Sequence, residues 1–181
     1  MILIFGKKYI NGQKEFNIST RRQETDKIVL CYFMGDITLQ KAAIEDLPTL
    51  ISIEESVANL KIYSAITSED EWREELAKST VYIIKKENVP VGDISYEMKN
   101  DSYAHLSGFA IIPQFQGQSI GREALTLVLE ELKGVKRIDL VTHPYNTPAI
   151  MLYLSFGFSI ESWKDNYFGD GEPRIVLAKT Q

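Results

Sequence analysis

Short apolar runs separated by polar turns dominate the middle of this chain. The runs at 81–84, 91–98 and 104–112 are joined by polar turns, which is typical of consecutive antiparallel strands. Further apolar runs predict strands at 37–39, 137–141, 158–163 and 175–178. Apolar spacing of three and four residues, together with helix-start residues, predicts helices over 46–58, 67–76, 117–132 and 147–156.

The order of these elements predicts an α+β fold with a mixed, mostly antiparallel central sheet flanked by helices. Before it, a hairpin of 2–10 and 16–18 around Asn11-Gly12 and an apolar strand at 28–33 predict an N-terminal β extension. The chain therefore divides into this extension, 1–34, and a main domain, 35–181. The apolar strand either extends the sheet or forms a seam between two copies, so a homodimer is one expectation.

Composition and charge narrow the classes of function. The chain has 181 residues, 44% of them hydrophobic, enough to bury a full core. Cys31 is its only cysteine, so no disulfide forms within the chain and a reducing, cytoplasmic compartment is expected. No apolar run has the roughly 18 residues that a membrane span needs, so no membrane partner is expected. A net charge of −5 disfavours nucleic acid as a partner.

The loop 113–122, Pro-Gln-Phe-Gln-Gly-Gln-Ser-Ile-Gly-Arg, carries the clearest chemical signal. It contains two glycines and leads into a long amphipathic helix. Backbone N–H groups of such a loop and the N-terminus of the following helix converge on one point, where they attract an anion. The loop therefore predicts a pyrophosphate site.

The same loop also fits Gly-x-Ser-x-Gly, the nucleophile motif of serine hydrolases, with Ser119 as nucleophile and Asp139 and His143 in the right chain order. Pro113 counts against this hypothesis, because the motif needs a strand that runs directly into the first glycine. Asp139 and His143 also lie on one strand and its end, which makes it difficult for them to converge on Ser119. His143 is instead expected to be exposed.

A second segment, 146–158, reads Asn-Thr-Pro-Ala-Ile-Met-Leu-Tyr-Leu-Ser-Phe-Gly-Phe. Together with the loop it resembles the GNAT superfamily of acetyl-CoA-dependent N-acetyltransferases. The loop of that family reads Arg/Gln-x-x-Gly-x-Gly/Ala and is followed by Asn-x-x-Ala-x-x-Leu-Tyr and Gly-Phe. The resemblance covers 37–179. Ser119 departs from it, since the family usually has glycine there, and a serine with positive φ costs about 1–2 kcal/mol.

The resemblance implies the acyl-CoA N-acyltransferase fold, acetyl-CoA as co-substrate and no metal. It places the strand at 104–112 along the pantetheine arm and the thioester, the loop around the pyrophosphate, and Tyr153 as the acid that protonates the leaving thiolate. The implied coenzyme A contacts are Phe109, Ala110, Ile111, Gln116, Gly117, Gln118, Ser119, Ile120, Gly121, Arg122, Asn146, Ala149 and Tyr153.

The base that frees the acceptor amine stays open. Many members that act on protein N-termini carry a glutamate at the position of Val141, which cannot act as a base. Histone-type members carry a glutamate at the position of His105, whose imidazole titrates near neutral pH. The alternative is a water chain ordered by Glu97, or by Glu54 and Glu55.

These observations predict an N-acetyltransferase that moves acetyl from acetyl-CoA directly to a primary amine of a small molecule or a peptide. Residues 35–79 carry ten acidic and four basic side chains, which favours a polyamine-like or other cationic acceptor near Glu54, Glu55 and Glu97. One alternative is a non-catalytic acyl-CoA-binding or interaction protein on the same fold. The other is the serine hydrolase using Ser119.

Overall fold

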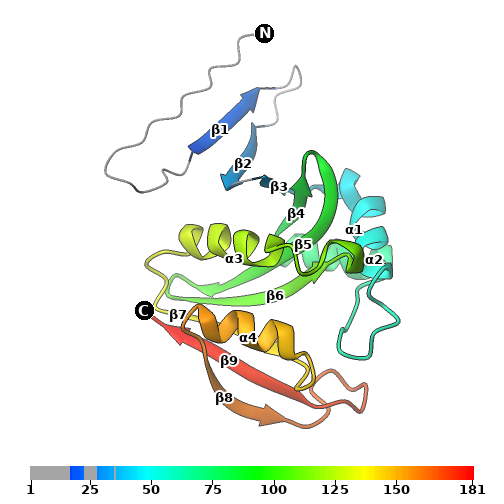
Figure 1. Ribbon diagram of the computed structural model, residues 1–181, viewed down its shortest axis with the longest axis vertical. Helices are drawn as coiled ribbons and strands as arrows, with labels where there is room; N and C mark the ends of the chain where they lie inside the picture. The colour runs from blue at the N-terminus through cyan, green and yellow to red at the C-terminus, as the bar shows by residue number, and fades with distance from the viewer. Residues whose placement is uncertain (1–16, 23–27, 35) are drawn as a thin grey trace.

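The computed structural model describes residues 17–22, 28–34 and 36–181, which form one continuous sheet with helices on both faces (Figure 1). The strands are β1 (Asn17–Arg22), β2 (Ile28–Met34), β3 (Ile37–Lys41), β4 (Thr80–Lys86), β5 (Val89–Asn100), β6 (Tyr103–Ile111), β7 (Arg137–Thr142), β8 (Ser159–Lys164) and β9 (Arg174–Thr180). The helices are α1 (Leu47–Glu55), α2 (Glu69–Lys78), α3 (Ile120–Glu131) and α4 (Thr147–Ser155), with short 3-10 turns η1 (Ile44–Asp46) and η2 (Pro113–Phe115).

The strand order in the sheet is β1-β2-β3-β4-β5-β6-β7-β9-β8. Every neighbouring pair is antiparallel except β6 and β7, which run parallel. The predicted mixed, mostly antiparallel sheet is therefore confirmed. The expected strand at 2–10 and the Asn11-Gly12 turn lie outside the described residues, and the division of the chain at residue 34 stays a prediction.

Local sequence explains where the central strands turn and where the helices begin. Glu87 and Asn88 both have positive φ, as a tight hairpin turn between right-twisted strands requires. The second helix begins two residues later than predicted, at Glu69, because the side chain of Ser68 accepts the N–H of Glu71 at 3.3 Å and caps α2. The predicted helix at 117–132 starts only at Ile120, since Gly117 and Ser119 have positive φ.

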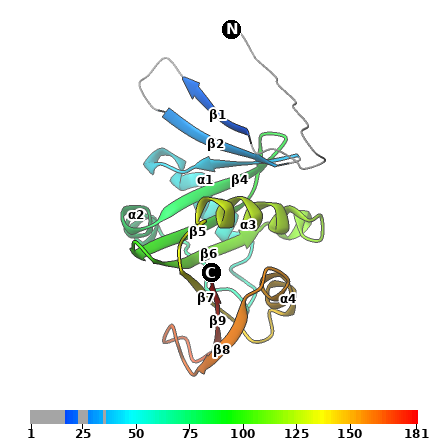
Figure 2. The ribbon, with the colours of Figure 1, turned by 90° about the vertical axis from the view of Figure 1, so that its left-hand side faces the viewer.

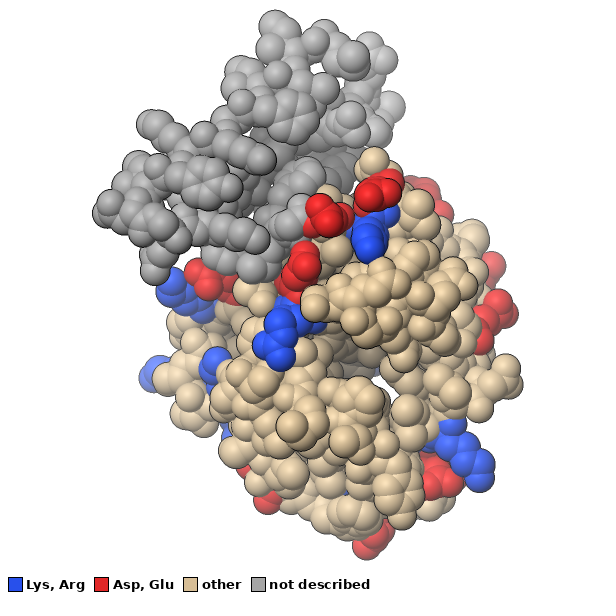
Figure 3. Space-filling model, viewed as in Figure 1, with Lys and Arg blue, Asp and Glu red and all other residues tan. Residues whose placement is uncertain are grey.

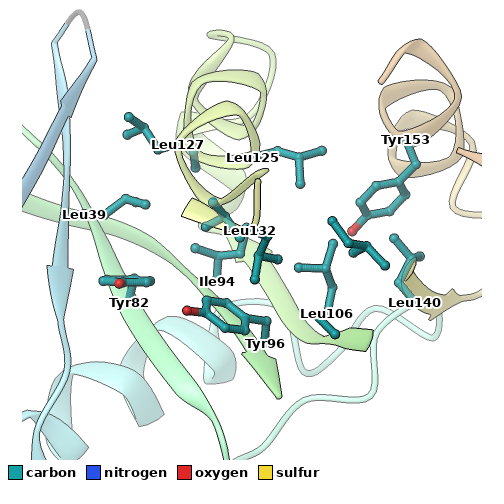
Figure 4. Close-up of a cluster of buried hydrophobic side chains, with 14 of the residues drawn as sticks. Leu39, Tyr82, Ile94, Tyr96, Leu106, Leu125, Leu127, Leu132, Leu140 and Tyr153 are labelled. Carbon is teal, nitrogen blue, oxygen red and sulfur yellow. The ribbon is translucent and has the colours of Figure 1, made fainter. Parts of the chain in front are cut away.

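The helices cover the sheet in pairs. Figure 2 shows α1 and α2 on one side of the sheet and α3 and α4 on the other. Under α3 and α4 lies the larger apolar core, part of which Figure 4 shows, with Leu125 of α3 and Tyr153 of α4 reaching toward strand residues such as Ile94 and Leu106. A smaller core around Trp72 and Leu50 holds α1 and α2 against the opposite face.

A β-bulge at Ser107 changes which face the end of β6 presents. Tyr96 of β5 pairs with Leu106, but Ser95 pairs with Gly108, so one residue of β6 has no partner on β5. Before the bulge, Leu106 belongs to the core under α3. After it, Phe109 packs on that core, whereas Ala110 belongs to the core under α1 and α2.

Leu125→Ala tests the larger core. Leu125 is fully buried, so its truncation leaves a cavity, and we expect the free energy of unfolding in urea to fall by about 2–5 kcal/mol. The matched control is Leu154→Ala on α4, where the side chain is 39% exposed and we expect a loss below about 1 kcal/mol. Equal losses in both variants would contradict the placement of α3 over this core.

Candidate functional site

The site begins where β6 and β7 stop pairing. Their parallel register runs from Tyr103 opposite Arg137 to Leu106 opposite Leu140 and then ends, although β6 continues to Ile111 and β7 to Thr142. The bulge at Ser107 follows directly after the last pair. The backbone beyond this point is therefore free, on the side that faces β7, to bind something other than a strand.

A cavity of about 450 Å³ occupies this separation. Strand residues 107–109 and 140–142 line it at the point of separation, the loop 115–122 and α4 line it on one side of the sheet, and residues of α1, α2 and the segment between them line it on the other. Figure 3 shows the surface hollowed between the regions of α3 and α4. One space thus joins the predicted pyrophosphate loop to the acidic helices.

The loop before α3 has the geometry of an anion site. Gly117 and Ser119 have φ of 75° and 65°, which turn the chain tightly into the helix. In the described part of the chain, no backbone carbonyl accepts the N–H of Ile120, Gly121 or Arg122, and the first helical hydrogen bond is from Glu123 to Ser119 at 3.0 Å. These N–H groups and the positive end of α3 fit the phosphates of acetyl-CoA.

Three long polar side chains fix the loop. Gln116 Nε2 donates to the carbonyl of Ile111 at 2.8 Å, which satisfies a carbonyl at the free end of β6. Arg122 donates to Ser155 Oγ at 2.9 Å and lies over the ring of Phe156, so it ties α3 to α4. Gln118 accepts from Lys86 Nζ at 2.8 Å, outside the cavity.

Most of the predicted coenzyme A contacts come together here. Eleven of the thirteen line the cavity: Phe109, Ile111, Gln116, Gly117, Ser119, Ile120, Gly121, Arg122, Asn146, Ala149 and Tyr153. The other two do not. Ala110 is buried against α1 and α2 because of the bulge, and Gln118 turns outward to Lys86. Their assignment as ligands stays a prediction.

Tyr153 reaches the cavity from α4 and packs edge-on against Phe158 (Figure 4). Burial, and to a lesser degree the nearby Tyr63 hydroxyl, raises the pKa of its hydroxyl, which therefore keeps its proton. Asn146 begins α4 by accepting the N–H of Ala149 at 3.4 Å, and this cap aims the helix at the cavity.

A buried carboxyl pair lines the opposite side. Asp93 of β5 is 1% exposed, and neither of its carboxyl oxygens meets a hydrogen-bond partner in the described part of the chain. Burial, followed by the neighbouring Glu54, raises the pKa of Asp93 well above its usual range. Burial also raises the pKa of Glu54, against the opposing effect of the Ile66 N–H, which Glu54 Oε2 accepts at 3.1 Å.

The other predicted acceptor-site residues lie elsewhere. Glu54 lines the cavity, but Glu55 is exposed on α1 and Glu97 pairs with Lys99 at 2.6 Å. His105 does not line the cavity, and its Nδ1 lies 2.7 Å from Asp139 Oδ1. The other carboxylate oxygen of Asp139, Oδ2, accepts a hydrogen bond from the hydroxyl of Tyr103. A role for His105 as the base stays a prediction that this geometry does not favour.

His143 is a correction to the sequence analysis, which expected it to be exposed. It is 2% exposed and lines the cavity, because the turn after β7 folds back so that the Tyr145 N–H meets its Nδ1 at 3.2 Å. Its Nε2 lies 3.4 Å from Glu172, while Asp139 pairs with His105. The acid–base pair of a serine hydrolase is therefore not assembled behind Ser119.

Asp93, Tyr63 and Arg174 are among the polar cavity residues that sequence reasoning missed. Arg174 is buried and donates to Ser64 Oγ at 2.7 Å and to Asp170. The available signal for Asp93 was an acidic residue inside the predicted strand 91–98, next to Gly92 and Ile94.

Over 17–22, 28–34 and 36–181, no group of three or more His, Cys, Asp or Glu side chains is arranged to hold a metal ion. No helix in these ranges combines the length and the apolar character needed to cross a bilayer.

Comparison with known proteins shows which family this chain matches. The model of the acetyltransferase (GNAT) family matches residues 47–158. Among curated proteins, the chain is 36% identical over 80 residues to the [ribosomal protein bS18]-alanine N-acetyltransferase of Escherichia coli K12, a match that covers 41% of this chain and 54% of that protein. It is 35% identical over 74 residues to the UPF0157 protein YqkA of Bacillus subtilis, covering 41% of this chain and 21% of YqkA. The matches thus span about half or less of these relatives.

Solved structures share the fold. The crystal structure of the ribosomal-protein-S18-alanine N-acetyltransferase from Escherichia coli superposes with a TM-score of 0.68 at 24% identity, covering 80% of this chain and 93% of that one. RimL, a ribosomal L7/L12 alpha-N-protein acetyltransferase in complex with coenzyme A, gives 0.69 at 18% identity, covering 81% and 95%. The predicted acyl-CoA N-acyltransferase fold is therefore confirmed.

Ser119→Gly tests the strain in the loop. Ser119 has a φ of 65°, where a residue with a side chain is strained by about 1–2 kcal/mol. Glycine removes this strain, but it also increases the conformational entropy of the unfolded chain, which cancels about half of the gain in stability. We expect the free energy of unfolding in urea to rise by about 0.5–1 kcal/mol. The control Ser102→Gly, in the turn between β5 and β6, removes the hydrogen bond that Ser102 Oγ donates to Asn100 Oδ1 at 3.0 Å without such relief, and should destabilise the protein. A loss of stability in Ser119→Gly would contradict the strain.

Proposed function

Because this chain belongs to the acetyltransferase (GNAT) family, we propose that it transfers acetyl from acetyl-CoA directly to a primary amine. The observation that supports this most is the single cavity that joins the separated ends of β6 and β7, the loop before α3 and the hydroxyl of Tyr153. An anion site, a free strand edge and a proton donor are the three elements that such a transfer needs around the thioester.

Positioning is the main contribution of this site. The loop N–H groups hold the diphosphate, and the edge of β6 beyond Ser107 holds the pantetheine arm in an extended conformation. Fixing thioester and amine together contributes up to about 7–11 kcal/mol, more than the roughly 10²–10⁴-fold of a positioned proton transfer. The rigid parts of the site therefore matter more than any single acid or base.

Tyr153 supplies the proton for the leaving group. Its raised pKa keeps the hydroxyl neutral at physiological pH, and its ring is held by Phe158. When the carbon–sulfur bond breaks, the sulfur leaves as a thiolate unless it gains a proton, so a hydroxyl at this place favours collapse toward the amide.

The acceptor is a primary amine of a small molecule or of a peptide. The name of the Escherichia coli relative, found both by sequence and by structure, states alanine N-acetylation of a ribosomal protein, which supports a peptide α-amino group. The acidic helices support a cationic acceptor. Val141 lines the cavity at the position where many family members that act on protein N-termini carry a glutamate. The base of this protein must therefore come from another position.

Acetyl-CoA binding and turnover test this function. We expect calorimetry to show one acetyl-CoA per chain, and thiol release to rise above the uncatalysed rate with at least one of spermidine, tyramine and the amide of Ala-Ala-Ala. Arg122→Ala should weaken acetyl-CoA binding by about tenfold, since the loop and α4 lose their link. Arg73→Ala, on the exposed side of α2, serves as its control. Binding without release on any of these amines would favour the non-catalytic alternative.

Tyr153→Phe tests the proton donor. We expect kcat to fall by about 10²-fold, because the leaving thiolate loses its acid, while the Kd of acetyl-CoA changes by less than about threefold. Tyr145→Phe is the matched control, since Tyr145 is 80% exposed. An unchanged kcat in Tyr153→Phe would remove Tyr153 from the reaction.

A further inference from the structure

Asp93 is the unexplained group of this cavity. A buried carboxyl group normally has hydrogen-bond donors around it, because burial without them costs several kcal/mol. Asp93 is 1% exposed and lines the cavity, and neither of its oxygens accepts from an N–H group or a hydroxyl in the described part of the chain. The side chain that interacts with it most is another carboxyl, that of Glu54. A ligand that brings N–H donors and positive charge would remove this cost.

The surroundings of Asp93 are acidic. Glu54 faces it from α1, Tyr63 from the segment between α1 and α2, and Glu75 from α2. Glu75 is occupied, because it accepts from Ser107 at 2.6 Å and pairs with Lys78 at 3.1 Å. Glu54 accepts one backbone N–H, from Ile66. Asp93 and Glu54 are therefore two cavity carboxyls with oxygens that these contacts leave available.

The position of Asp93 suits a reacting amine. Asp93 pairs with Ala110 across β5 and β6, between Phe109 and Ile111, which both line the cavity beyond the last β6–β7 pair. An added Cβ at Gly108 would lie 3.9 Å from Asp93 Oδ2, in van der Waals contact, so the missing side chain leaves this side of the carboxyl uncovered. The carboxyl thus lies beside the strand segment proposed to hold the thioester, on the face of the sheet that carries α1 and α2.

We propose that Asp93 and Glu54 together bind the primary ammonium group of the acceptor, and that Asp93 takes one of its protons. This rests on the proposed function. The ligand class is a primary ammonium group, whose three N–H donors and positive charge match two neighbouring carboxylates.

The protons of the transfer balance. The ammonium nitrogen gives one proton to the Asp93 carboxylate and keeps its lone pair, which forms the new bond to the thioester carbon. As the carbon–sulfur bond breaks, its electron pair goes to sulfur, which takes the Tyr153 proton. The nitrogen loses its second proton to the Tyr153 oxygen. Amide and thiol leave, and Asp93 returns its proton to water.

The environment favours this transfer. Burial and the charge of Glu54 raise the pKa of Asp93 toward that of the amine. A carboxylate in this environment is a stronger base than one in water, so less free energy is needed to free the amine.

Asp93→Asn with the control Asp101→Asn, in the exposed turn after β5, tests ammonium binding. Calorimetry is done on protein saturated with coenzyme A, with spermidine and with the amide of Ala-Ala-Ala. For whichever of these amines binds wild type more tightly, we expect Asp93→Asn to raise the Kd by about tenfold or more at about pH 7. The affinity for coenzyme A itself should stay within about threefold, which also shows that the variant folds.

The pH profile separates proton removal from a structural role. At about pH 7 the amine is protonated, so we expect kcat/KM of Asp93→Asn to be lower than wild type by about 10²-fold. At about pH 10 the amine loses its proton to solvent, and the ratio should shrink to about tenfold or less. A ratio that does not change with pH would overturn the role of Asp93 in taking the proton.

Glu54→Gln, with the exposed Glu74→Gln on α2 as control, is the second variant. We expect weaker amine binding with coenzyme A affinity retained, even if Asp93→Asn does not fold. Amine binding by wild type that both variants keep within about threefold overturns the proposal, as does the absence of amine binding to wild type. Failure of the proposed function looks different: amines bind and depend on Asp93, but no thiol is released.

Discussion

The end of pairing between β6 and β7 is the constraint on which the rest of this structure depends. A parallel pair that continued to Ile111 and Thr142 would close the sheet, and the cavity would not exist. Because buried backbone groups need partners, opening the sheet is stable only where other groups meet them. Gln116 does this for the carbonyl of Ile111, and the remaining edge is left to the co-substrate. The site is thus a gap in a hydrogen-bonded ladder.

The two faces of the sheet carry groups of opposite charge preference at this gap. The face under α3 and α4 carries the loop with free N–H groups and Tyr153, which suits a long anionic molecule with a leaving sulfur. The face under α1 and α2 carries Asp93 and Glu54, which suits a cation. In the proposed function, an anionic co-substrate and a cationic acceptor would therefore approach the thioester carbon from opposite faces of the sheet.

Local patterns in the sequence account for most of the fold and for one side of the site. Strands with turns at Glu87 and Asn88, and a glycine-containing loop before an amphipathic helix, are encoded within a few residues, so eleven of thirteen predicted contacts line the cavity. Asp93 and His143 depend on tertiary packing. One is buried only because α1 and α2 cover β5, the other because Tyr145 folds back over it. Ala110 lies outside the cavity lining because of the bulge, which the order of apolar residues did not predict.

The bulge at Ser107 also determines how this segment can change over evolution. Ser107 is the residue of this stretch without a partner on β5, so its deletion would leave Gly108 opposite Ser95 and keep the faces of all later residues. Closing the bulge with Ser107 retained would instead move each later residue one place along β5. Phe109 and Ile111 would then turn toward α1 and α2, and Ala110 would turn into the core under α3, which exchanges the linings of the two half-sites in one step.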